Sequence, residues 1–447
     1  MLVEFSVTNY RSIFEETTLS MVASKKKSKE PRLDSQATFE LGASGVRLLK
    51  CAAIYGANGA GKSNVFRALG FMKSFVTKSA NADDIDAEIE CTPFLLNEDS
   101  AKEPSKFRMV FVIGKITYEY GFAVTPARIV EEWLLSKTQT SSRTVELFSR
   151  NDNGIKVNTV FTEGSGLESK TRSNALFIST CAQFNGSTST EVLRWFKKLQ
   201  VVSGLSDNAF LSATKRSLQK NETASGVRAV VQAFDLGFSN FAAVKDERKI
   251  EDNFDSMPPE MAGLAAELKK LLSTSSNPRY RISTTHPVFD SKGNKCRDTE
   301  FDLEQDESEG TKKLVAFAGP LSDSLSSQCV LVIDEFDARL HPLITKQIIR
   351  MFNGTNTNPT NAQLIVATHD TNLLDKDLLR RDQIWFVEKD VLGASHLTSL
   401  VEYKVRNDAS YQKDYILGKY GAIPFLGSKD HVFTSTRQRV PKSEEKA

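Results

Sequence analysis

Eight residues near the N-terminus, Gly56-Ala57-Asn58-Gly59-Ala60-Gly61-Lys62-Ser63, have types and a spacing that could hold phosphate. They match the pattern GxxxxGK[ST] and stand between an apolar run at 52–55 and a helical pattern from Asn64 onward. Glycine permits backbone conformations in which successive N–H groups point at phosphate oxygens, and the helix adds the positive end of its dipole. Lys62 supplies a cation for the β- and γ-phosphates, and the Ser63 hydroxyl can ligate Mg²⁺. A chance match would lack the flanking strand and helix, so the segment predicts a nucleoside triphosphate site.

A pair of carboxylates, Asp334 and Glu335, follows the apolar run 329–333. A continuous apolar run predicts a buried parallel strand, whose carboxyl end would bring both carboxylates beside the phosphates. Asp334 suits the Mg²⁺ shell, through water or through Ser63, and Glu335 suits polarisation of an attacking water. An acidic pair after a strand often arises by chance, but a phosphate loop in the same chain favours the catalytic interpretation.

A histidine, His369, follows another apolar strand pattern at 364–368. An imidazole at that position can reach the γ-phosphate and report whether it is present. A lone histidine after a strand is usually incidental, but this one lies 35 residues after Asp334 with one helix between, which fits a switch histidine. His341 is the competing candidate; because it precedes Pro342 at a helix start, capping or a subunit contact is the favoured role.

A short motif, Ser308-Glu309-Gly310, opens a helical pattern 26 residues before Asp334. A small hydroxyl residue and a glycine at a helix start can form a second anion site. Such a motif is often only a helix cap, but its position ahead of the acidic strand favours a part in nucleotide binding.

The composition is that of an ordinary globular protein. Of 447 residues, 40% are hydrophobic and 26% charged, and 58 Lys and Arg oppose 56 Asp and Glu, so no global field marks a nucleic-acid binder. The length allows two or three domains, or one lobed ATPase with an insertion. No apolar stretch approaches the roughly 18 residues of a membrane span, and the N-terminus lacks a basic segment followed by a hydrophobic run. We expect a cytoplasmic protein without membrane contact.

The cysteines are widely spaced and none belongs to a CxxC pair, so we expect small core residues in a reducing compartment rather than disulfides or a zinc site. They are Cys51, Cys91, Cys181, Cys296 and Cys329.

Alternating and continuous apolar patterns predict the elements that position these groups. In the N-terminal part the expected strands are 2–7, 107–113, 116–122 and 128–135, with a hairpin turn at 114–115 and a turn at 9–12. In the C-terminal part we expect a strand at 329–333, a helix at 341–353, a strand at 363–367, a helix near 371–381 and a strand at 384–388.

The pattern changes between 137 and 280. Residues 137–170 are polar and predict loops and edge strands, whereas 193–202 and 261–272 predict amphipathic helices with basic faces. These faces could contact protein or nucleic acid, although a solvated surface is the favoured interpretation. Their basic residues are Arg194, Lys197, Lys198, Lys269 and Lys270. We therefore divide the chain into an N-terminal head lobe at 1–136, an inserted partner or regulatory domain at 137–280, a C-terminal head lobe at 281–426 and a flexible tail at 427–447.

In order and spacing, the motifs resemble those of ABC-type ATPases of the SMC/Rad50/RecF branch. Within that branch they resemble the RloA/AbiLii-like AAA-family ATPases of bacterial anti-phage and abortive-infection systems. The matching segments are 56–63, 308–310, Asp334-Glu335-Phe336-Asp337-Ala338-Arg339-Leu340-His341-Pro342 and Thr368-His369-Asp370. Residues 415–424 also resemble the C-terminal segment of the group.

The resemblance implies an α/β fold of the P-loop NTPase, ABC type: a mixed-sheet head flanked by helices, with an inserted, partly helical domain. It implies ATP and Mg²⁺ as ligands and a head-to-tail homodimer, or a higher homo-oligomer, in which each phosphate loop faces Ser308–Gly310 of a second copy. The expected catalytic residues are Glu335, His369 and Lys62, and the expected metal ligands are Ser63 and Asp334. The expected nucleotide contacts are Gly56, Ala57, Asn58, Gly59, Ala60, Gly61, Lys62, Ser63, Asn64, Arg11, Ser308 and Gly310; such heads commonly use the arginine of the 9–12 turn to reach the phosphates.

The chain departs from the family pattern at three places. The LSGGQ-type signature is reduced to Ser308-Glu309-Gly310, His341 replaces the aspartate that usually follows the acidic strand, and no glutamine stands near 93–96, where a Q-loop would be sought.

The resemblance implies an ATP-dependent sensor that regulates a partner effector, a nuclease or toxin encoded nearby, in anti-phage defence. Two alternatives stay open: an SMC- or RecF-like ATPase of DNA repair or recombination, and an ATP-locked scaffold that scarcely hydrolyses. A transporter cassette is disfavoured because those heads are shorter. The chain resembles OLD-type ATPases without their nuclease domain: only 78 residues follow His369, and Asp375 and Asp377 suit capping better than metal binding.

Overall fold

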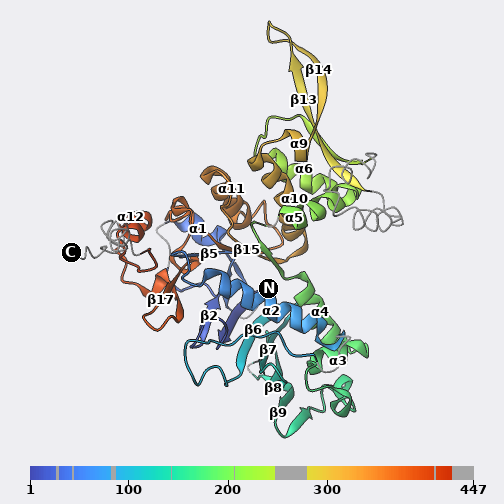
Figure 1. Ribbon diagram of the computed structural model, residues 1–447, viewed down its shortest axis with the longest axis vertical. Helices are drawn as coiled ribbons and strands as arrows, with labels where there is room; N and C mark the ends of the chain where they lie inside the picture. Colours follow the sequence, from blue (N-terminus) through green and yellow to red (C-terminus); the bar gives the residue numbers. More distant parts are fainter. Residues whose placement is uncertain are drawn as a thin grey trace, which may run out of the picture.

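The computed structural model describes residues 1–26, 30–42, 45–81, 87–141, 143–205, 207–246, 279–406 and 409–424 (Figure 1). The predicted α/β fold class, a P-loop NTPase of ABC type, is confirmed in its main features. A largely parallel sheet carries the phosphate loop, an antiparallel sheet lies beside it, and helices cover both faces of the parallel sheet.

The antiparallel sheet has seven strands in the order β10-β9-β8-β7-β6-β1-β2. Its strands are β1 (Leu2–Thr8), β2 (Thr17–Ser20), β6 (Ser105–Ile113), β7 (Ile116–Val124), β8 (Ile129–Thr138), β9 (Val145–Asn151) and β10 (Gly154–Val157). Along β6 burial alternates from Ser105 to Val110, because one face of the sheet packs on the core and the other is partly solvated. The alternation predicted for 2–7 is only partly present in burial, since Phe5, Ser6 and Val7 are all buried. The predicted strands of the N-terminal part, and the edge strands of 137–170, are therefore confirmed.

The second sheet has six strands in the order β11-β15-β16-β5-β17-β18. Its strands are β5 (Cys51–Gly56), β11 (Gln200–Ser203), β15 (Val330–Asp334), β16 (Gln363–Ala367), β17 (Ile384–Lys389) and β18 (Ser395–Ser399). All neighbours are parallel except β17 and β18, which form an antiparallel pair at one edge. The central strands β5 and β16 are buried along their whole length, which explains their continuous apolar sequences.

Successive side chains along each strand of the parallel sheet point to opposite faces, and a separate hydrophobic core lies on each face. Ala52 and Ile54 of β5 face the core shared with the antiparallel sheet, α2, α3 and α4. Cys51, Ala53 and Tyr55 face the opposite core, which α5, α6, α10 and α11 cover. The helices are α1 (Pro31–Gln36), α2 (Lys62–Lys78), α3 (Phe177–Gln183), α4 (Ser187–Lys198), α5 (Asp207–Leu218), α6 (Asn221–Gln232), α9 (Leu303–Asp306), α10 (Glu309–Ser327), α11 (Pro342–Asn353) and α12 (Tyr411–Ile416).

Two smaller sheets complete the described part. Strands β3 (Thr38–Glu40) and β4 (Arg47–Leu49) form a hairpin, and β12 (Asn240–Lys245), β13 (Tyr280–Phe289) and β14 (Lys295–Asp302) form an antiparallel arm. The hairpin of β13 and β14 extends away from the body, and α5, α6 and α10 lie at its base (Figure 1). Short 3₁₀ helices are Ser79–Asn81, Thr162–Gly164, Glu168–Lys170, Thr371–Leu373, Arg381–Gln383 and Leu400–Glu402.

The described part of 137–280 is distributed over several layers of the molecule. Strands β9 and β10 extend the antiparallel sheet, β11 is the edge strand of the parallel sheet, and α5 and α6 pack on α10. The predicted helix at 261–272 and the predicted tail at 427–447 lie outside the described residues.

Two predicted helices are wrong in part. The helix predicted at 193–202 ends at Lys198, because 200–203 pair with β15 as β11. The helix predicted near 371–381 is a single 3₁₀ turn at Thr371–Leu373 followed by turns. There the Asp370 and Asp375 carboxylates accept hydrogen bonds from nearby backbone nitrogens, which competes with helix formation.

Four of the five cysteines are buried core residues as predicted, whereas Cys296 is exposed on β14. Within the described ranges, no helix has both the length and the apolar composition needed to cross a membrane.

Candidate functional site

The phosphate loop connects the end of β5 to the start of α2, as the sequence predicts. Gly59 and Gly61 have φ values of 78° and 111°, a region that side chains other than glycine rarely adopt. A Cβ atom on Gly61 would lie 2.1 Å from Ser395 Oγ, so this position also excludes a side chain on steric grounds. The loop geometry therefore depends on glycine at both positions.

The ammonium group of Lys62 is held by backbone carbonyls at the start of the phosphate loop. Its Nζ atom donates hydrogen bonds to the carbonyls of Gly56 (2.7 Å) and Ala57 (3.2 Å), and the side chain is buried. Burial lowers the pKa of Lys62, while the carboxylates of Asp334, Asp337 and Glu335 act in the opposite direction. The cation therefore lies within the field of all three acidic groups.

The register of the parallel sheet brings the predicted motifs to one edge. Strand β16 lies between β5 and β15, with Ala367 opposite Ile54 and Val366 opposite Ile333. Beyond the strands the backbone ladder continues, because Thr368 N donates to Ile54 O (3.1 Å) and Phe336 N to Ala367 O (2.9 Å). The phosphate loop, the acidic pair and the switch segment thus leave adjacent strands at their carboxyl ends, where ligands bind in such sheets.

The acidic pair adopts a constrained backbone. Glu335 has φ 52°, in the left-handed region that is uncommon for a residue with a side chain, and its N–H donates to Asp334 Oδ1 (3.1 Å). Gly204, just after β11, donates from its backbone nitrogen to Asp334 O (2.6 Å). A Cβ atom on Gly204 would lie 2.2 Å from Glu335 O. The chain after β11 is therefore packed directly against the acidic pair, a contact that the sequence analysis did not anticipate.

His369 is anchored through its backbone to a third carboxylate. Its backbone nitrogen donates to Asp337 Oδ1 (3.1 Å) and Oδ2 (3.3 Å), and the residue lies at the surface with its imidazole partly covered by the protein. The pKa of His369 is lowered, first by desolvation and then by the Lys62 cation, with Asp337, Glu335 and Asp334 acting in the opposite direction. Asp337 was not among the predicted site residues, although it lies in the same acidic run.

Arg11 lies in the turn after β1, with φ 53°, and its backbone nitrogen donates to Thr92 O (3.0 Å). Its guanidinium contacts Tyr10, with an Nε–Oη distance of 3.3 Å and a separation of 5.6 Å from the ring centroid. The next residue, Ser12, accepts a hydrogen bond from Asn64 Nδ2 at the start of α2 (2.7 Å). The turn is therefore joined to the phosphate-loop helix, and the guanidinium itself lies on Tyr10.

A network of hydroxyl groups joins two distant segments, the turn at Ser12 and the start of β18 at Ser395, to the phosphate loop. Ser395 Oγ donates to Ala60 O (2.6 Å) and lies 2.8 Å from Ser12 Oγ, and Ser395 N donates to Ser12 O (2.7 Å). Ser12 and Ser395 were not predicted as site residues, because no local pattern marks a serine that acts through a tertiary contact.

The Ser308–Gly310 motif opens α10 as predicted. Ser308 Oγ accepts from Thr311 N (3.2 Å), and Glu309 forms an ion pair with Arg339 (3.2 Å) in the segment after the acidic strand. A Cβ atom on Gly310 would lie 3.6 Å from Arg339 O, an ordinary contact. The start of α10, beside α9, lies well apart from α2 (Figure 1). The motif therefore adjoins the segment after Glu335 rather than the chain's own phosphate-loop helix.

Two competing candidates have structural roles. His341 Nδ1 accepts from Leu343 N (3.2 Å) at the start of α11, which confirms the predicted cap. Asp375 accepts from the backbone nitrogen of Asp377 and pairs with Lys346 (3.2 Å). It stabilises a turn rather than the start of the predicted next helix.

The donor set fits a magnesium ion held jointly with phosphate. Ser63 and Asp334 would provide oxygen ligands, which Mg²⁺ prefers, and the Asp334 carboxylate lies near enough to Lys62 to oppose the lowering of the Lys62 pKa by burial. Over the part of the chain that the structure describes, no group of three or more His, Cys, Asp or Glu side chains could hold a metal by itself. Magnesium at such a site takes its other ligands from phosphate and water, so two protein oxygen ligands would be enough.

A family model described as "AAA domain, putative AbiEii toxin, Type IV TA system" matches residues 51–375, which include the phosphate loop, the acidic pair and His369. No curated protein matches the chain significantly.

Solved structures similar to the chain include three SMC heads. The SMC head domain from Thermotoga maritima is 13% identical with a TM-score of 0.40, covering 89% of this chain and 98% of that chain. An SMC head bound to the C-winged helix domain of ScpA is 14% identical with a TM-score of 0.42, covering 89% and 97%. An SMC head with an extended coiled coil, bound to the C-terminal domain of ScpA derived from Pyrococcus furiosus, is 13% identical with a TM-score of 0.38, covering 94% and 98%. Likeness at this level carries no argument about function.

Proposed function

The chain belongs to the family of AAA domains described as putative AbiEii toxins of type IV toxin–antitoxin systems, and we propose that it binds and hydrolyses ATP with Mg²⁺. The observation that carries the proposal is the Lys62 ammonium, which is fixed at the phosphate loop and lies within the field of Asp334, Glu335 and Asp337. A cation beside carboxylates at the carboxyl ends of parallel strands is the arrangement that phosphoryl transfer requires.

Each side chain has a separate part in this proposal. Backbone N–H groups of 56–63 and the Lys62 ammonium bind the phosphates, together with Asn64, and Ser63 and Asp334 hold Mg²⁺, which neutralises phosphate charge when bound. Glu335 accepts a proton from, or orients, the attacking water, and His369 contacts the γ-phosphate. Arg11 would have to leave Tyr10 to reach the phosphates. Catalysis then depends on position and electrostatics rather than on a covalent intermediate.

We place the second half of the site on another copy of the chain. Gly310 adjoins Arg339, and the start of α10 lies apart from α2 (Figure 1), so this helix start is available to face the nucleotide of a second copy. In this head-to-tail dimer, or a higher oligomer built from it, ATP joins the two copies and hydrolysis releases them.

In the cell, we propose that an RloA/AbiLii-like ATPase of this kind senses a trigger in the cytoplasm and controls an effector, a nuclease or toxin, in anti-phage defence. The family description and the motif pattern of 334–342 and 368–370 support this role. We also propose a division of the chain into two head lobes at 1–136 and 281–426, a segment at 137–280 that is inserted between them in sequence and contributes strands to both sheets, and a tail at 427–447.

The proposal is tested with two variants of the full chain. Lys62→Ala should weaken ATP binding by at least about 100-fold, because the loop loses its cation. Glu335→Gln should keep ATP affinity, lose at least about 100-fold in kcat and accumulate a dimer with Mg-ATP in light scattering. A Lys78→Ala variant at the other end of α2 is the matched control and should behave as the wild type.

Three results would revise the proposal. Normal hydrolysis by the Gln variant would show that Glu335 is not the base, and a monomer with Mg-ATP would remove the shared site. Wild-type protein that binds ATP and dimerises but never turns over would indicate an ATP-locked scaffold.

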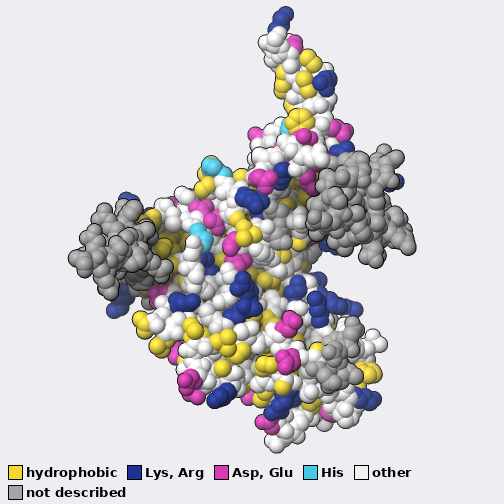
Figure 2. Space-filling model, in the orientation of Figure 1, with side chains coloured by type: hydrophobic (Ala, Val, Ile, Leu, Met, Phe, Trp, Pro, Cys, Tyr) yellow, Lys and Arg dark blue, Asp and Glu magenta, His cyan; other side chains and the backbone are white. Residues whose placement is uncertain are grey.

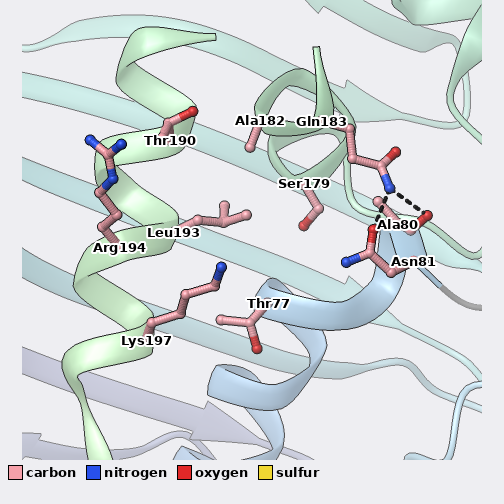
Figure 3. Close-up of a pocket in the computed structure, with 10 residues that line it drawn as sticks. All are labelled: Thr77, Ala80, Asn81, Ser179, Ala182, Gln183, Thr190, Leu193, Arg194 and Lys197. Carbon is pink, nitrogen blue, oxygen red and sulfur yellow. Dashed lines mark hydrogen bonds between the residues drawn. The ribbon is translucent and has the colours of Figure 1, made fainter. Parts of the chain in front are cut away.

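A second candidate function, an ATPase acting on DNA ends, is favoured by one observation. A cavity of about 320 Å³ lies between the end of α2 and helices α3 and α4, and the exposed basic residues Arg194 and Lys197 line it (Figure 3). Exposed basic side chains beside a polar cavity could form ion pairs with the backbone phosphates of DNA. Stimulation of ATP turnover by duplex DNA, lost in an Arg194→Ala/Lys197→Ala variant, would favour this candidate; DNA-independent turnover would favour the sensor.

A further inference from the structure

Four large apolar side chains are exposed on two loops that lie beside the nucleotide site. Leu95 (64%) and Leu96 (68%) belong to the loop before β6, and Val391 (101%) and Leu392 (70%) belong to the turn between β17 and β18. Apolar side chains gather at the lower left of Figure 2, over β17 and the loop between α2 and β6. We call these four residues the apolar patch.

The two loops are in contact with each other. A Cβ atom on Gly393 would lie 2.5 Å from Leu96 Cδ1, so Leu96 rests directly on the β17–β18 turn. The side chains of the patch therefore belong to one surface, and large apolar groups gathered on one surface mark interaction sites more often than isolated ones do.

Both loops are fixed by contacts of their own, so the patch is presented by an ordered backbone. Phe94 is buried, its ring lies 5.2 Å from that of Phe14, and its backbone nitrogen donates to Asn9 Oδ1 (3.0 Å). In the turn, Asp390 Oδ1 accepts from the backbone nitrogens of Leu392 (2.9 Å) and Ala394 (2.8 Å). A surface whose backbone is already ordered loses little conformational entropy when a partner binds.

We propose that the apolar patch is the docking site for a segment of a partner protein that carries apolar anchors flanked by Lys or Arg. The charge beside the patch selects this partner. Between Leu96 and β6, three exposed acidic residues (Glu98, Asp99 and Glu103) outnumber one exposed base, Lys102, which leaves two negative charges (three minus one). At the β17–β18 turn, exposed Glu388 and Asp390 outnumber Lys389 and add one more (two minus one). This excess disfavours anionic bilayers and nucleic acid, and it disfavours a second copy presenting the same surface.

The patch is connected to the nucleotide site through hydrogen bonds of both loops, one from the Ser395 hydroxyl and one to a backbone carbonyl. Ser395, which follows the turn, donates to Ala60 O in the phosphate loop (2.6 Å), and Thr92 O accepts from Arg11 N (3.0 Å). Binding at the patch and nucleotide binding should therefore influence each other reciprocally. This coupling rests on the proposed ATPase function, whereas docking itself does not.

The experiment uses the full chain without nucleotide and a fluorescent amphipathic peptide of leucine and lysine, about 18 residues long. We expect the peptide to bind, and Leu96→Asp or Leu392→Asp to weaken its affinity by at least about tenfold. A leucine–glutamate peptide should not bind. Val160→Asp is the matched control, because Val160 is equally exposed (64%) in a loop after β10. All three positions are exposed, so thermal unfolding should be unchanged.

Other results would overturn the docking proposal. The first two are no binding of the basic peptide and an equal loss of peptide affinity in Val160→Asp. The others are loss of a dimer when Leu392 is changed, which would assign the patch to a second copy, and binding to phosphatidylserine vesicles that the patch variants abolish, which would assign it to a membrane.

Coupling is tested separately, by repeating the titration with Glu335→Gln loaded with Mg-ATP. The peptide affinity of this variant should differ by at least about threefold between the nucleotide-free and the Mg-ATP-loaded protein. Adding Ser395→Ala to the same variant should remove most of that difference and leave peptide binding to the nucleotide-free protein intact. An unchanged affinity would overturn the coupling and leave docking standing.

Discussion

Both carboxylate oxygens of Asp337 accept a hydrogen bond from the backbone nitrogen of His369. This contact joins the segment after β15 to the segment after β16. It fixes the position of the His369 backbone relative to Asp334 and Glu335, because Asp337 and Glu335 belong to the same short segment. The positions of Glu335, the proposed base, and of His369, the proposed γ-phosphate contact, are therefore linked through one carboxylate.

We expect Asp337→Ala to lower kcat by about tenfold while ATP affinity changes little, because the histidine loses its backbone anchor but the phosphate loop is untouched. Asp337→Asn retains one acceptor oxygen and should lose less. Steady-state hydrolysis and ATP titration of the two variants measure this. Asp377→Ala, in the nearby exposed turn, is the control; an equal loss there would indicate a general effect on folding.

Gly204→Ala tests the contact between the chain after β11 and the acidic pair. The new methyl group would clash with Glu335 O, only 2.2 Å away, and backbone atoms cannot yield as a flexible side chain would. We expect kcat to fall by about tenfold and stability by about 1–3 kcal/mol. Gly70→Ala in α2, whose nearest neighbour is Val201 Cγ1 at 3.7 Å, should be neutral or stabilising. Full activity of Gly204→Ala would show that Glu335 does not depend on this contact.

The sequence predicts the parts of the site that lie on contiguous motifs. Gly56–Ser63, Asp334 with Glu335, and His369 each follow an apolar run, and apolar runs predict parallel strands whose carboxyl ends meet. Ser395 and Gly204 could not be found in this way. Their contacts with Ala60 and Asp334 exist only once β18 and β11 have joined the sheet.

The two mispredicted elements have different origins. Residues 200–203 continue the amphipathic pattern of α4, but tertiary pairing with β15 overrides it. Residues 371–381 have apolar periodicity, and their leucines are buried, but side-chain caps end each turn before a helix forms.

The pH dependence of turnover should report the lowered pKa of His369. Desolvation and the Lys62 cation place this pKa below its usual value of 6.5, so the imidazole is neutral at pH 7. Because the folded state disfavours protonation of His369, its contribution to the free energy of unfolding is present above pH 6.5 and is lost as the pH falls below that value. We expect kcat/KM to fall along an acid limb below pH 6.5, and His369→Gln to remove that limb. The two pH profiles of kcat/KM, for the wild type and for His369→Gln, are compared directly, because protonation of the nucleotide affects both equally. Identical acid limbs would show that His369 does not titrate in the reaction.

Magnesium dependence should reveal the role of Ser63. Chelation with EDTA should abolish hydrolysis, because Ser63 and Asp334 cannot neutralise phosphate charge by themselves. In Ser63→Ala the ion loses one of its two protein ligands, so half-maximal activity should require at least about tenfold more Mg²⁺, with much of kcat recovered at saturation. Ser74→Ala, on the exposed face of α2, is the matched control. An unchanged Mg²⁺ requirement in Ser63→Ala would contradict this ligand assignment, and the remaining donors at the carboxyl end of β15 would then have to hold the ion.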